Sequence, residues 1–494
     1  MHRKMPMFYS AILLTGVNLL LRLISTSFQV YISGRIGAAG VGLLQLVMTV
    51  GGMSMTAGMA GIRTATMYLT AEELGKRQTG NVHWVLKGCF LYSLLCSGFV
   101  AVIVYSAAPY LAIYWIGDRR TIDAVRLFAV FLPITCLCGV MTGYFTAANR
   151  IGTLAAVEVV EQLFSMGVTV ASLTLWAGQD SARNCQCVVL GSCLGACLTF
   201  FVLLFLRIKE HVKATKQIHV RKRLLHTAVP LALADDFKAG INTVENLMVP
   251  KRLSRYPGAT NPLALFGTVS GMVFPVMMFP AAILFGLAEL LIPELARCNA
   301  AGSKTRIHYL VKRSLRVTML YGCAFCGLLF LFADDLCLAL YHNTQAGLYL
   351  KWFSLLVPML YCDAITDAMI KGLGQQKISV RYNIFTSCMD VLLLYLLLPR
   401  YGISGYFSSF LITHLINFSL SLRRLLKITG QRVPILTPIL CVSAAAAAIA
   451  LCFSIQSIIF RGVCFIAVLG SLLTLLQILS KEDLHWIRGL LYKK

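Results

Sequence analysis

Long apolar stretches, separated only by short polar breaks, restrict this chain more than any other feature. Hydrophobic residues make up 58% of its 494 residues, charged residues make up 13%, and the mean hydropathy is +0.76. Ordinary soluble domains carry about 25% charged residues, so a chain this apolar would aggregate in water. An apolar run of roughly 20 residues spans the bilayer core as a helix. The sequence therefore predicts an all-α integral membrane protein.

Fourteen transmembrane spans are predicted, and they leave no room for a soluble domain. The first begins within MHRKMPMFYSAILL, whose basic start is typical of a signal peptide. Because the apolar run continues to about residue 32 without a small-residue cleavage site, we interpret it as a span. The predicted spans are 8–32, 41–70, 84–107, 124–148, 153–178, 187–207, 224–249, 263–293, 309–333, 350–372, 382–399, 403–422, 435–455 and 458–479.

The placement of the 44 Lys and Arg residues predicts the orientation of the chain and excludes nucleic acid as a partner of this chain of net charge +24. With a cytoplasmic N-terminus, 30 of them fall on the cytoplasmic side, 11 on the outer side and 3 inside spans. This is the positive-inside distribution. The largest cytoplasmic cluster, RIKEHVKATKQIHVRKR (207–223), is expected to contact anionic lipid headgroups. We predict a multi-pass protein of the cytoplasmic membrane with both termini cytoplasmic.

Motifs for metal or nucleotide chemistry are missing from the sequence. Most of the 17 cysteines lie in apolar spans, where Cys behaves as a small hydrophobe, and NCQC (184–187) lacks zinc spacing. GRIGAAGVG (34–42) follows an apolar helix and has no Lys-Ser/Thr, so it predicts a tight outer loop rather than a phosphate loop. We predict no enzymatic activity and no cofactor, apart from an open choice of Na⁺ or H⁺ coupling.

An internal duplication runs through the sequence. HWVLK (83–87) and HYLVK (308–312) are separated by an offset of 225. Other equivalent pairs are Phe128 with Phe353, Pro133 with Pro358 and, at an offset of 221, Glu73 with Glu294. Six predicted spans separate equivalent positions, so the two copies cross the membrane in the same direction.

This duplication predicts two parallel six-helix lobes and two additional helices. Twin lobes are typical of transporters that expose a central site to each side of the membrane in turn. The predicted parts are an N-lobe (1–207), a basic cytoplasmic linker (208–223), a C-lobe (224–425), and a final segment with spans thirteen and fourteen and a cytoplasmic tail (426–494).

Polar side chains follow one face of the first helix of each lobe. A charge near the bilayer centre costs about 2.5–3.5 kcal/mol on insertion scales, so such groups face a hydrated cavity or pair with each other. In LALADDFKAGINTVENL (231–247), spacings of 3, 4 and 3 place Asp235, Lys238, Asn242 and Glu245 on one helix face. In the first span, spacings of 3, 4, 3 and 4 do the same for Thr15, Asn18, Arg22, Ser25 and Gln29.

We predict that these stripes line one central cavity. For the stripe at 235–245, a structural ion pair between Asp235 and Lys238 is the alternative. Arg22 has no acid nearby in its own helix, and a planar guanidinium suits a phosphate ligand because it donates bidentate hydrogen bonds.

Other polar residues inside spans leave alternatives open. Arg63 lines the cavity or extends to the cytoplasmic interface. Asp363 and Asp367 line the cleft or pair with Lys371. Glu289 is predicted to be buried, and is a candidate proton carrier. Glu158 and Glu161 lie close enough to a cytoplasmic helix end to be solvated.

Two segments resemble the stage V sporulation protein B group of the multidrug/oligosaccharidyl-lipid/polysaccharide exporter superfamily. LLLRLISTSFQVYISGRIGAAGVGLLQL (19–46) resembles the beginning of that group, and VENLMVPKRL (244–253) its seventh helix. The matching elements are Arg22, Glu245 before PKRL, and the series Arg35, Gly37, Gly40, Gly42 and Gln45. The resemblance covers nearly the whole chain and implies fourteen helices in a 6 + 6 + 2 arrangement.

The resemblance also implies a function. It suggests a flippase for polyprenyl-pyrophosphate-linked saccharides, similar to the lipid II flippases, in spore cortex or cell-wall synthesis. Arg22 matches a cavity arginine in the first helix of those flippases. Two departures put the substrate in question: Arg63 stands where the group has Pro after Gly-Ile, and Glu245 replaces a shorter acid.

Three functions stay open at this stage. In a flippase, Arg22 and Lys238 would hold the pyrophosphate of the lipid-linked saccharide. A proton- or sodium-coupled drug antiporter on the same scaffold would use Asp235, Glu245 or Glu289 as the coupling carboxylate. A non-transporting scaffold for cell-wall synthases would tolerate neutralisation of all these charges.

Overall fold

The computed structural model describes residues 7–76, 80–176, 181–209, 220–431, 436–476 and 478 of the chain. Within these residues the fold is almost wholly helical and has no β-strand, which confirms the predicted fold class. Most of the predicted linker 208–223 and the tail after residue 478 lie outside the described residues.

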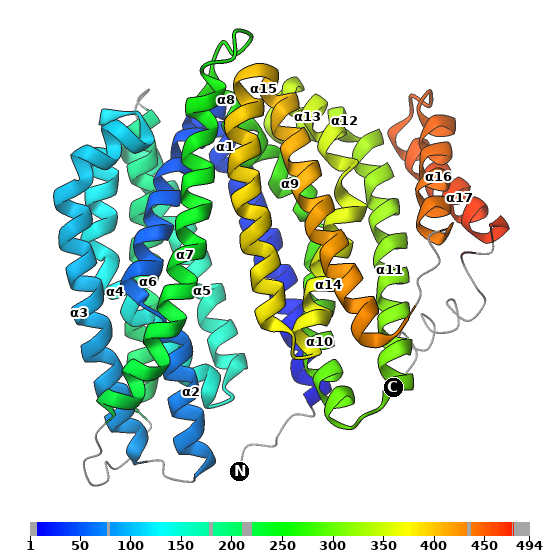
Figure 1. Ribbon diagram of the computed structural model, residues 1–494. Coiled ribbons are helices and arrows are strands. Elements are labelled where there is room, and N and C mark those ends of the chain that lie inside the picture. The colour runs from blue at the N-terminus through cyan, green and yellow to red at the C-terminus, as the bar shows by residue number, and fades with distance from the viewer. Residues whose placement is uncertain are drawn as a thin grey trace. The chain divides into compact units, whose positions relative to one another are not determined.

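The chain packs as two compact units. Unit 1 contains the residues up to Gly271 together with Leu394–Gly402, and unit 2 contains Met272–Leu393 and the residues from Ile403 onward. In unit 1, α3, α4 and α6 lie side by side (Figure 1). The helices of unit 1 are α1 (Met7–Met59), α2 (Ile62–Gly75), α3 (Asn81–Tyr110), the π-helix η1 (Leu111–Ile116), the 3₁₀-helix η2 (Arg119–Thr121), α4 (Ile122–Ala147), α5 (Ile151–Trp176), α6 (Ser181–Ile208), α7 (Arg221–Leu253) and α8 (Pro262–Thr268).

Unit 2 begins within a short π-helix and ends with a helical hairpin. That hairpin, α16 and α17, packs on α11 through a buried cluster around Phe465. The helices of this part are η3 (Val269–Val273), α9 (Phe274–Met278), α10 (Ala281–Ala300), α11 (Lys304–Leu331), α12 (Ala333–Tyr341), α13 (Thr344–Ser354), α14 (Val357–Gly372), α15 (Gln376–Thr429), α16 (Leu436–Cys452) and α17 (Ile458–Leu475).

The boundary between the units differs from the boundary between the predicted lobes. α7, which was predicted to open the second lobe, packs against α1, α2 and α3 and belongs to unit 1. The repeat offset in the sequence carries no information about which helices pack together. The lobes 1–207 and 224–425 stay a prediction about the duplication.

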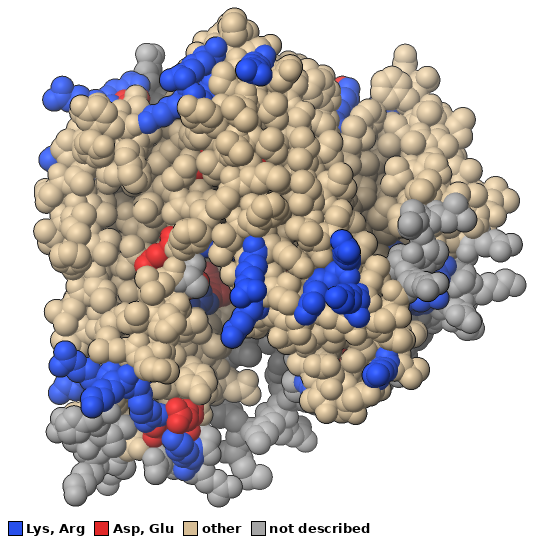
Figure 2. Space-filling view, in the orientation of Figure 1, with Lys and Arg blue, Asp and Glu red and all other residues tan. Residues whose placement is uncertain are grey.

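Eight helices in the described part are long and apolar enough to cross a membrane, or up to ten if two bent pairs each count as one span. The chain is therefore a multi-pass membrane protein, while the count of fourteen stays a prediction. α7 is not in this set, because its charged side chains interrupt every apolar window. In Figure 2, Lys and Arg gather at the upper and lower ends of the region of α3 and α7, and acidic side chains also reach the surface between these ends.

α1 and α15 each contain two predicted spans that meet at a single non-helical residue. The breaks are Gly37 (φ 68°, ψ 173°) and Gly402 (φ 57°, ψ −134°). Glycine reaches positive φ at little steric cost, so one residue suffices to break the helix. The loop predicted at 34–42 was therefore too long, since only Gly37 leaves the helical conformation there.

Backbone turns repeat at the predicted offset of 225. Gly117 (φ 85°) and His342 (φ 51°) both adopt the left-handed conformation. The next residues, Asp118 and Asn343, both accept a backbone N–H hydrogen bond on the side chain, from two and three residues further along. Such Asx caps satisfy amide groups at the start of a helix.

A second turn repeats in the same way. Asn149 (φ 57°) and Gly374 (φ 78°) are left-handed. The amides of Arg150 and Gln375 then donate to the carbonyl oxygen five residues earlier, at 3.0 and 3.1 Å. This is the arrangement that ends a helix with a left-handed residue. The duplication read from side chains is thus present in the backbone.

Candidate functional site

The stripe predicted at 235–245 lies on α7. Asp235, Lys238 and Asn242 are exposed, and Glu245 is half-buried. No ion pair joins Asp235 to Lys238 in the described structure, and the assignment of this stripe to a cavity stays a prediction. α7 has 33 residues. At 1.5 Å per residue a helix of this length extends for about 50 Å, enough to cross a bilayer.

The stripe in the first span lies on α1, which packs against α7 within unit 1. Arg22 is half-buried and Ser25 is exposed. Gln29 donates from Nε2 to the carbonyl oxygen of Gly271 at 3.1 Å. The side chain of Asn18 lies outside the described residues.

Arg22 and Lys238 lie at similar positions along their helices. Arg22 is the sixteenth residue of α1, whose first segment ends at Gly37, and Lys238 is the eighteenth of the 33 residues of α7. Both cations therefore lie near the middle of a helical segment that is long enough to span the membrane. The structure places a basic group at this depth on two helices of the same unit.

Arg63 adds a third cation to unit 1. It is exposed in the first turn of α2, and it interacts electrostatically with Glu158 of α5. Glu161 accepts a hydrogen bond from Thr199 Oγ1 of α6 at 2.6 Å. Both glutamates are half-buried, so the expectation that they are solvated stays a prediction. Gly143 permits the close approach of α4, because an added Cβ would lie 2.5 Å from the Arg63 carbonyl oxygen.

Asp236 was not among the predicted site residues, because it lies one position away from the stripe. It is half-buried, and its Oδ1 is buried with no hydrogen-bond partner in the described structure. An unpaired carboxylate oxygen removed from water is costly unless it binds a proton or a ligand. Asp236 is therefore a further candidate for a carboxylate that takes up a proton.

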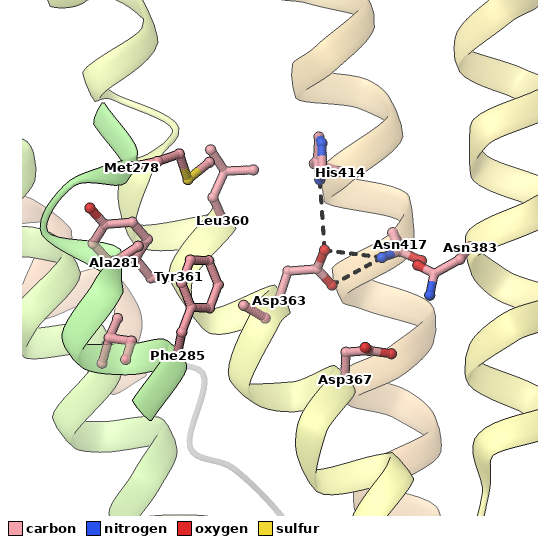
Figure 3. A pocket seen from close by; sticks show the side chains of 12 residues that line it. Met278, Ala281, Phe285, Leu360, Tyr361, Asp363, Asp367, Asn383, His414 and Asn417 are labelled. Atoms are coloured by element: carbon pink, nitrogen blue, oxygen red, sulfur yellow. Dashed lines mark hydrogen bonds and ion pairs between the residues drawn. The ribbon is translucent and has the colours of Figure 1, made fainter. Parts of the chain in front are cut away.

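Unit 2 contains its own polar pocket, a cavity of about 190 Å³ between α10, α14 and α15. Asp363 of α14 lies at its centre and is buried (Figure 3). Its Oδ1 and Oδ2 accept hydrogen bonds from Asn417 Nδ2 at 3.1 and 3.0 Å. His414 Nδ1 lies 3.6 Å from Oδ2. Met278, Leu284, Phe285 and Leu360 form the apolar part of the wall.

His414 lies beside this carboxylate. Its ring packs on Phe410, with 4.2 Å between centroids, and its buried Nδ1 has no hydrogen-bond partner in the described structure. The pocket wall therefore places an acid, an imidazole and an amide together.

Asp367 and Asp390 lie near this pocket but have partners of their own. Asp367 pairs with Lys371 at 2.5 Å, which confirms the pairing alternative for this residue, and also accepts from Ser379. Asp390 is buried and accepts hydrogen bonds from Ser409 at 2.6 Å and Thr413 at 3.2 Å. Sequence reasoning named Asp363 and Asp367 but missed Asn417, His414 and Asp390. The sequence signal that could have identified His414 and Asn417 is their i, i+3 spacing within an apolar span.

Glu289 belongs neither to the polar stripes of unit 1 nor to the polar pocket of unit 2. It lies on α10 and its side chain is exposed, so the expectation of burial was wrong. Its position four residues before the end of the predicted apolar run does not determine its exposure, because burial within a helix depends on which face meets a neighbour.

The arrangement provides two kinds of chemistry. Unit 1 carries fixed cations at mid-helix positions, which suit a phosphate group. Unit 2 carries an acid, an imidazole and an amide in a partly open pocket, which form a polar site within an apolar wall. Within the described residues there is no group of three or more His, Cys, Asp or Glu side chains that could hold a metal ion.

Comparisons with known proteins point in one direction. The MatE family model matches residues 14–177 and 252–396. Stage V sporulation protein B of Bacillus subtilis (strain 168) is 21% identical over 434 residues, which cover 81% of this chain and 80% of that protein.

Solved structures share the fold at low sequence identity. The lipid II flippase MurJ in an inward closed conformation has a TM-score of 0.69 at 12% identity, and the match covers 94% of this chain and 98% of that one. An inward-facing multidrug resistance MATE family transporter of the MOP superfamily has a TM-score of 0.66 at 14% identity, covering 85% and 100%.

Proposed function

The chain belongs to the MatE family, and from this premise we propose that it moves a polyprenyl-pyrophosphate-linked saccharide across the cytoplasmic membrane by alternating access. The relatives named as a lipid II flippase and as a stage V sporulation protein support this substrate class and a role in spore cortex or cell-wall synthesis. The observation that carries the proposal is the pair of mid-helix cations, Arg22 and Lys238, on two packed helices of unit 1.

In this proposal Arg22 and Lys238 bind the pyrophosphate. Arg22 supplies bidentate donors, and Lys238 supplies a mobile point charge. Ser25 and Asn242 are exposed on the same stripes and would hydrogen-bond the saccharide, as would the Oε1 of Gln29. The polyprenyl tail would stay in lipid, along the last two helices.

The membrane potential would favour export of such an anion. Moving one elementary charge through 100 mV is worth about 2.3 kcal/mol, and an anion moves outward downhill in a cell that is negative inside. Coupling to an ion is then optional. The cytoplasmic basic cluster at 207–223 would contact anionic lipids near the entry side.

A second function is favoured by one observation, the Asp363–His414 pocket of unit 2. A proton-coupled antiporter needs a carboxylate that is protonated and released in each cycle, and this pocket provides one. In that case the cargo is a drug-like molecule, and Asp363 and Asp236 replace Glu289 as the preferred coupling carboxylates.

The deciding experiment uses the purified protein in liposomes that contain a fluorescent lipid-linked saccharide. Exposure of the headgroup to an impermeant quencher gives the flipping rate. We expect Arg22→Ala and Lys238→Ala each to slow flipping at least tenfold, as for the loss of one charged hydrogen bond of about 1.5–3 kcal/mol. Lys304→Ala is the matched control, because Lys304 is exposed at the start of α11 and far in sequence from both stripes.

The three functions give different results in this system. Unchanged flipping in both Arg22→Ala and Lys238→Ala contradicts the flippase proposal. Drug-stimulated proton flux that is lost in Asp363→Asn but kept in Arg22→Ala supports the antiporter. A protein that moves neither cargo, and whose cavity charges can be neutralised without a wall defect in cells, is a scaffold for cell-wall synthases.

A further inference from the structure

Five cations gather at the end of unit 1 that the predicted orientation places outside the cell. They are Arg119 and Arg120 at the start of η2, Lys251 and Arg252 in the last turn of α7, and Arg255 just beyond it. We call these five residues the outer basic patch. Figure 2 shows Lys and Arg side chains along the upper edge of the view, where α7 ends.

Contacts hold the two segments of the patch together. Lys251 Nζ donates to the carbonyl oxygen of Tyr114, in the π-helix that leads directly to Arg119. The guanidinium of Arg252 stacks on Tyr395, with 3.2 Å from Cζ to the ring centroid. The patch is therefore a fixed arrangement of side chains within unit 1.

Internal pairing neutralises little of this charge. Arg120 pairs with Asp118 at 2.8 Å. The side chains of Arg119 and Arg255 are exposed and have no hydrogen bond or ion pair to any described residue. The ion pair between Arg120 and Asp118 lowers the pKa of Asp118, mainly through the hydrogen bond from Arg120. Asp118 is therefore charged at neutral pH and offsets one cation of five.

Helix electrostatics explains only part of the patch. Lys251 and Arg252 compensate the negative C-terminal end of α7. Arg119 and Arg120 precede α4, where the positive end of the helix disfavours cations. Asp118 offsets the charge of Arg120 there, so the cost in free energy that a bound anion would relieve is that of Arg119.

The patch also contradicts the charge rule that the rest of the chain obeys. Lys and Arg are scarce in outer loops of membrane proteins. Yet five of the eleven predicted outer Lys and Arg residues belong to this one patch. The positive-inside rule does not explain a concentration of Lys and Arg on the predicted outer side, and a bound anionic ligand would explain it.

Aromatic side chains set the depth of the patch. Tyr110, Tyr114, Tyr395 and Tyr401 lie in the same part of unit 1 and are 55, 60, 47 and 57% exposed. Exposed Tyr residues form belts at the level of the lipid headgroups. A ligand at this depth is a lipid, because its phosphate reaches the cations while its chains stay in the bilayer.

From these observations we propose that the outer basic patch binds the phosphate group of an anionic lipid in the outer leaflet. Arg119 and Arg255 donate to the phosphate, and Arg252, held by Tyr395, forms the wall beside it. The site does not depend on the flippase proposal, since a transporter of any cargo on this fold could carry it.

The test uses the full-length protein in phosphatidylcholine nanodiscs with increasing phosphatidylglycerol, and native mass spectrometry counts the retained phosphatidylglycerol. The variant is Arg119→Gln/Arg255→Gln, whose side chains are exposed and unpaired, so that folding should not change. Each cation near a lipid surface is worth about a fivefold change in binding. We therefore expect retention in the double variant to need about 25-fold more phosphatidylglycerol.

The matched control is Lys304→Gln/Lys377→Gln, which removes the same charge at exposed positions on helix starts of unit 2. We expect it to bind like the wild type. Equal weakening in variant and control overturns the site. Displacement of phosphatidylglycerol by millimolar inorganic pyrophosphate would assign the patch to a soluble anion and overturn the lipid part of the proposal.

The side of the membrane is tested separately. We expect Arg255→Cys to react with a membrane-impermeant maleimide in whole cells, above the background of the wild type. Labelling that requires permeabilised cells would place the patch on the cytoplasmic side and overturn its assignment to the outer leaflet.

Discussion

The two halves of the duplication share a backbone but differ in chemistry at equivalent positions. At the offset of 225, Cys138 of α4 corresponds to Asp363 of α14, and Glu158 of α5 corresponds to Asn383 of α15. Each pair has one carboxylate, but on opposite helices. In unit 1, the carboxylate of Glu158 interacts with Arg63, while in unit 2 that of Asp363 interacts with Asn417 and His414.

This difference shows that the position of a polar group in its helix and the interactions that it makes have separate origins. The turns at 149 and 374 both lead into the following helix, so Glu158 and Asn383 occupy the same position in equivalent helices. The partners come from other helices. Arg63 of α2 interacts electrostatically with Glu158, whereas Asn417 and His414 of α15 contact Asp363.

The largest contrast between the halves is expected at Glu73 and Glu294. Glu73 is 2% exposed and accepts from Arg223 at 2.8 Å and Asn81 at 2.9 Å. Glu294 pairs with Arg306 but remains partly exposed. Glu73→Ala should cost about 3 kcal/mol, because it removes the acceptor of two charge-assisted hydrogen bonds of about 1.5 kcal/mol each, and Glu294→Ala about 1 kcal/mol or less.

Unfolding of the purified variants in mixed detergent micelles measures this contrast. The free energy of unfolding is compared with that of the wild type under the same conditions. Equal costs at the two positions would mean that burial of Glu73 contributes nothing, and the comparison of the halves would fail at this point.

An intermediate effect is expected in the unit 2 pocket. Asp363→Ala leaves Asn417 Nδ2 buried without an acceptor and should destabilise the protein by about 2 kcal/mol. At the equivalent position of unit 1, Cys138→Ala should cost about 1 kcal/mol, because only a small apolar group is lost. The same unfolding experiment measures both, and a larger cost at Cys138 would contradict the assigned hydrogen bonds.

The smallest effect concerns the repeated turn. Gly374→Ala places a Cβ in the left-handed conformation and should cost about 1 kcal/mol. At the equivalent Asn149, a change to Gly removes that strain and should be neutral or stabilising by a few tenths of a kcal/mol. Thermal unfolding of both variants tests this, and a destabilising Asn149→Gly would show that the Asn side chain has a further role.

Sequence patterns predicted what depends on helix periodicity. The stripes on α1 and α7 follow from spacings of three and four, and the repeat follows from short matching segments. They could not predict which helices meet. Asn417 and His414 lie about 50 residues from Asp363, and only the packing of α14 against the second half of α15 brings them together.

The same reason explains the wrong expectation of burial for Glu289. It was judged by its position within an apolar run, but exposure depends on the neighbouring helix. Thr199 of α6 meets Glu161, while the described structure gives Glu289 no such neighbour. Position along a helix gives depth in the membrane, and only packing gives direction.

The polarity of α7 has a consequence for how the protein is made. A helix with Asp235, Asp236, Lys238 and Glu245 partitions poorly from the translocon into lipid by itself. Its packing partners α1, α2 and α3 precede it in the chain, so they are already synthesised when α7 emerges from the ribosome. Because of this order of synthesis, α7 can pack against a protein surface instead of entering lipid alone.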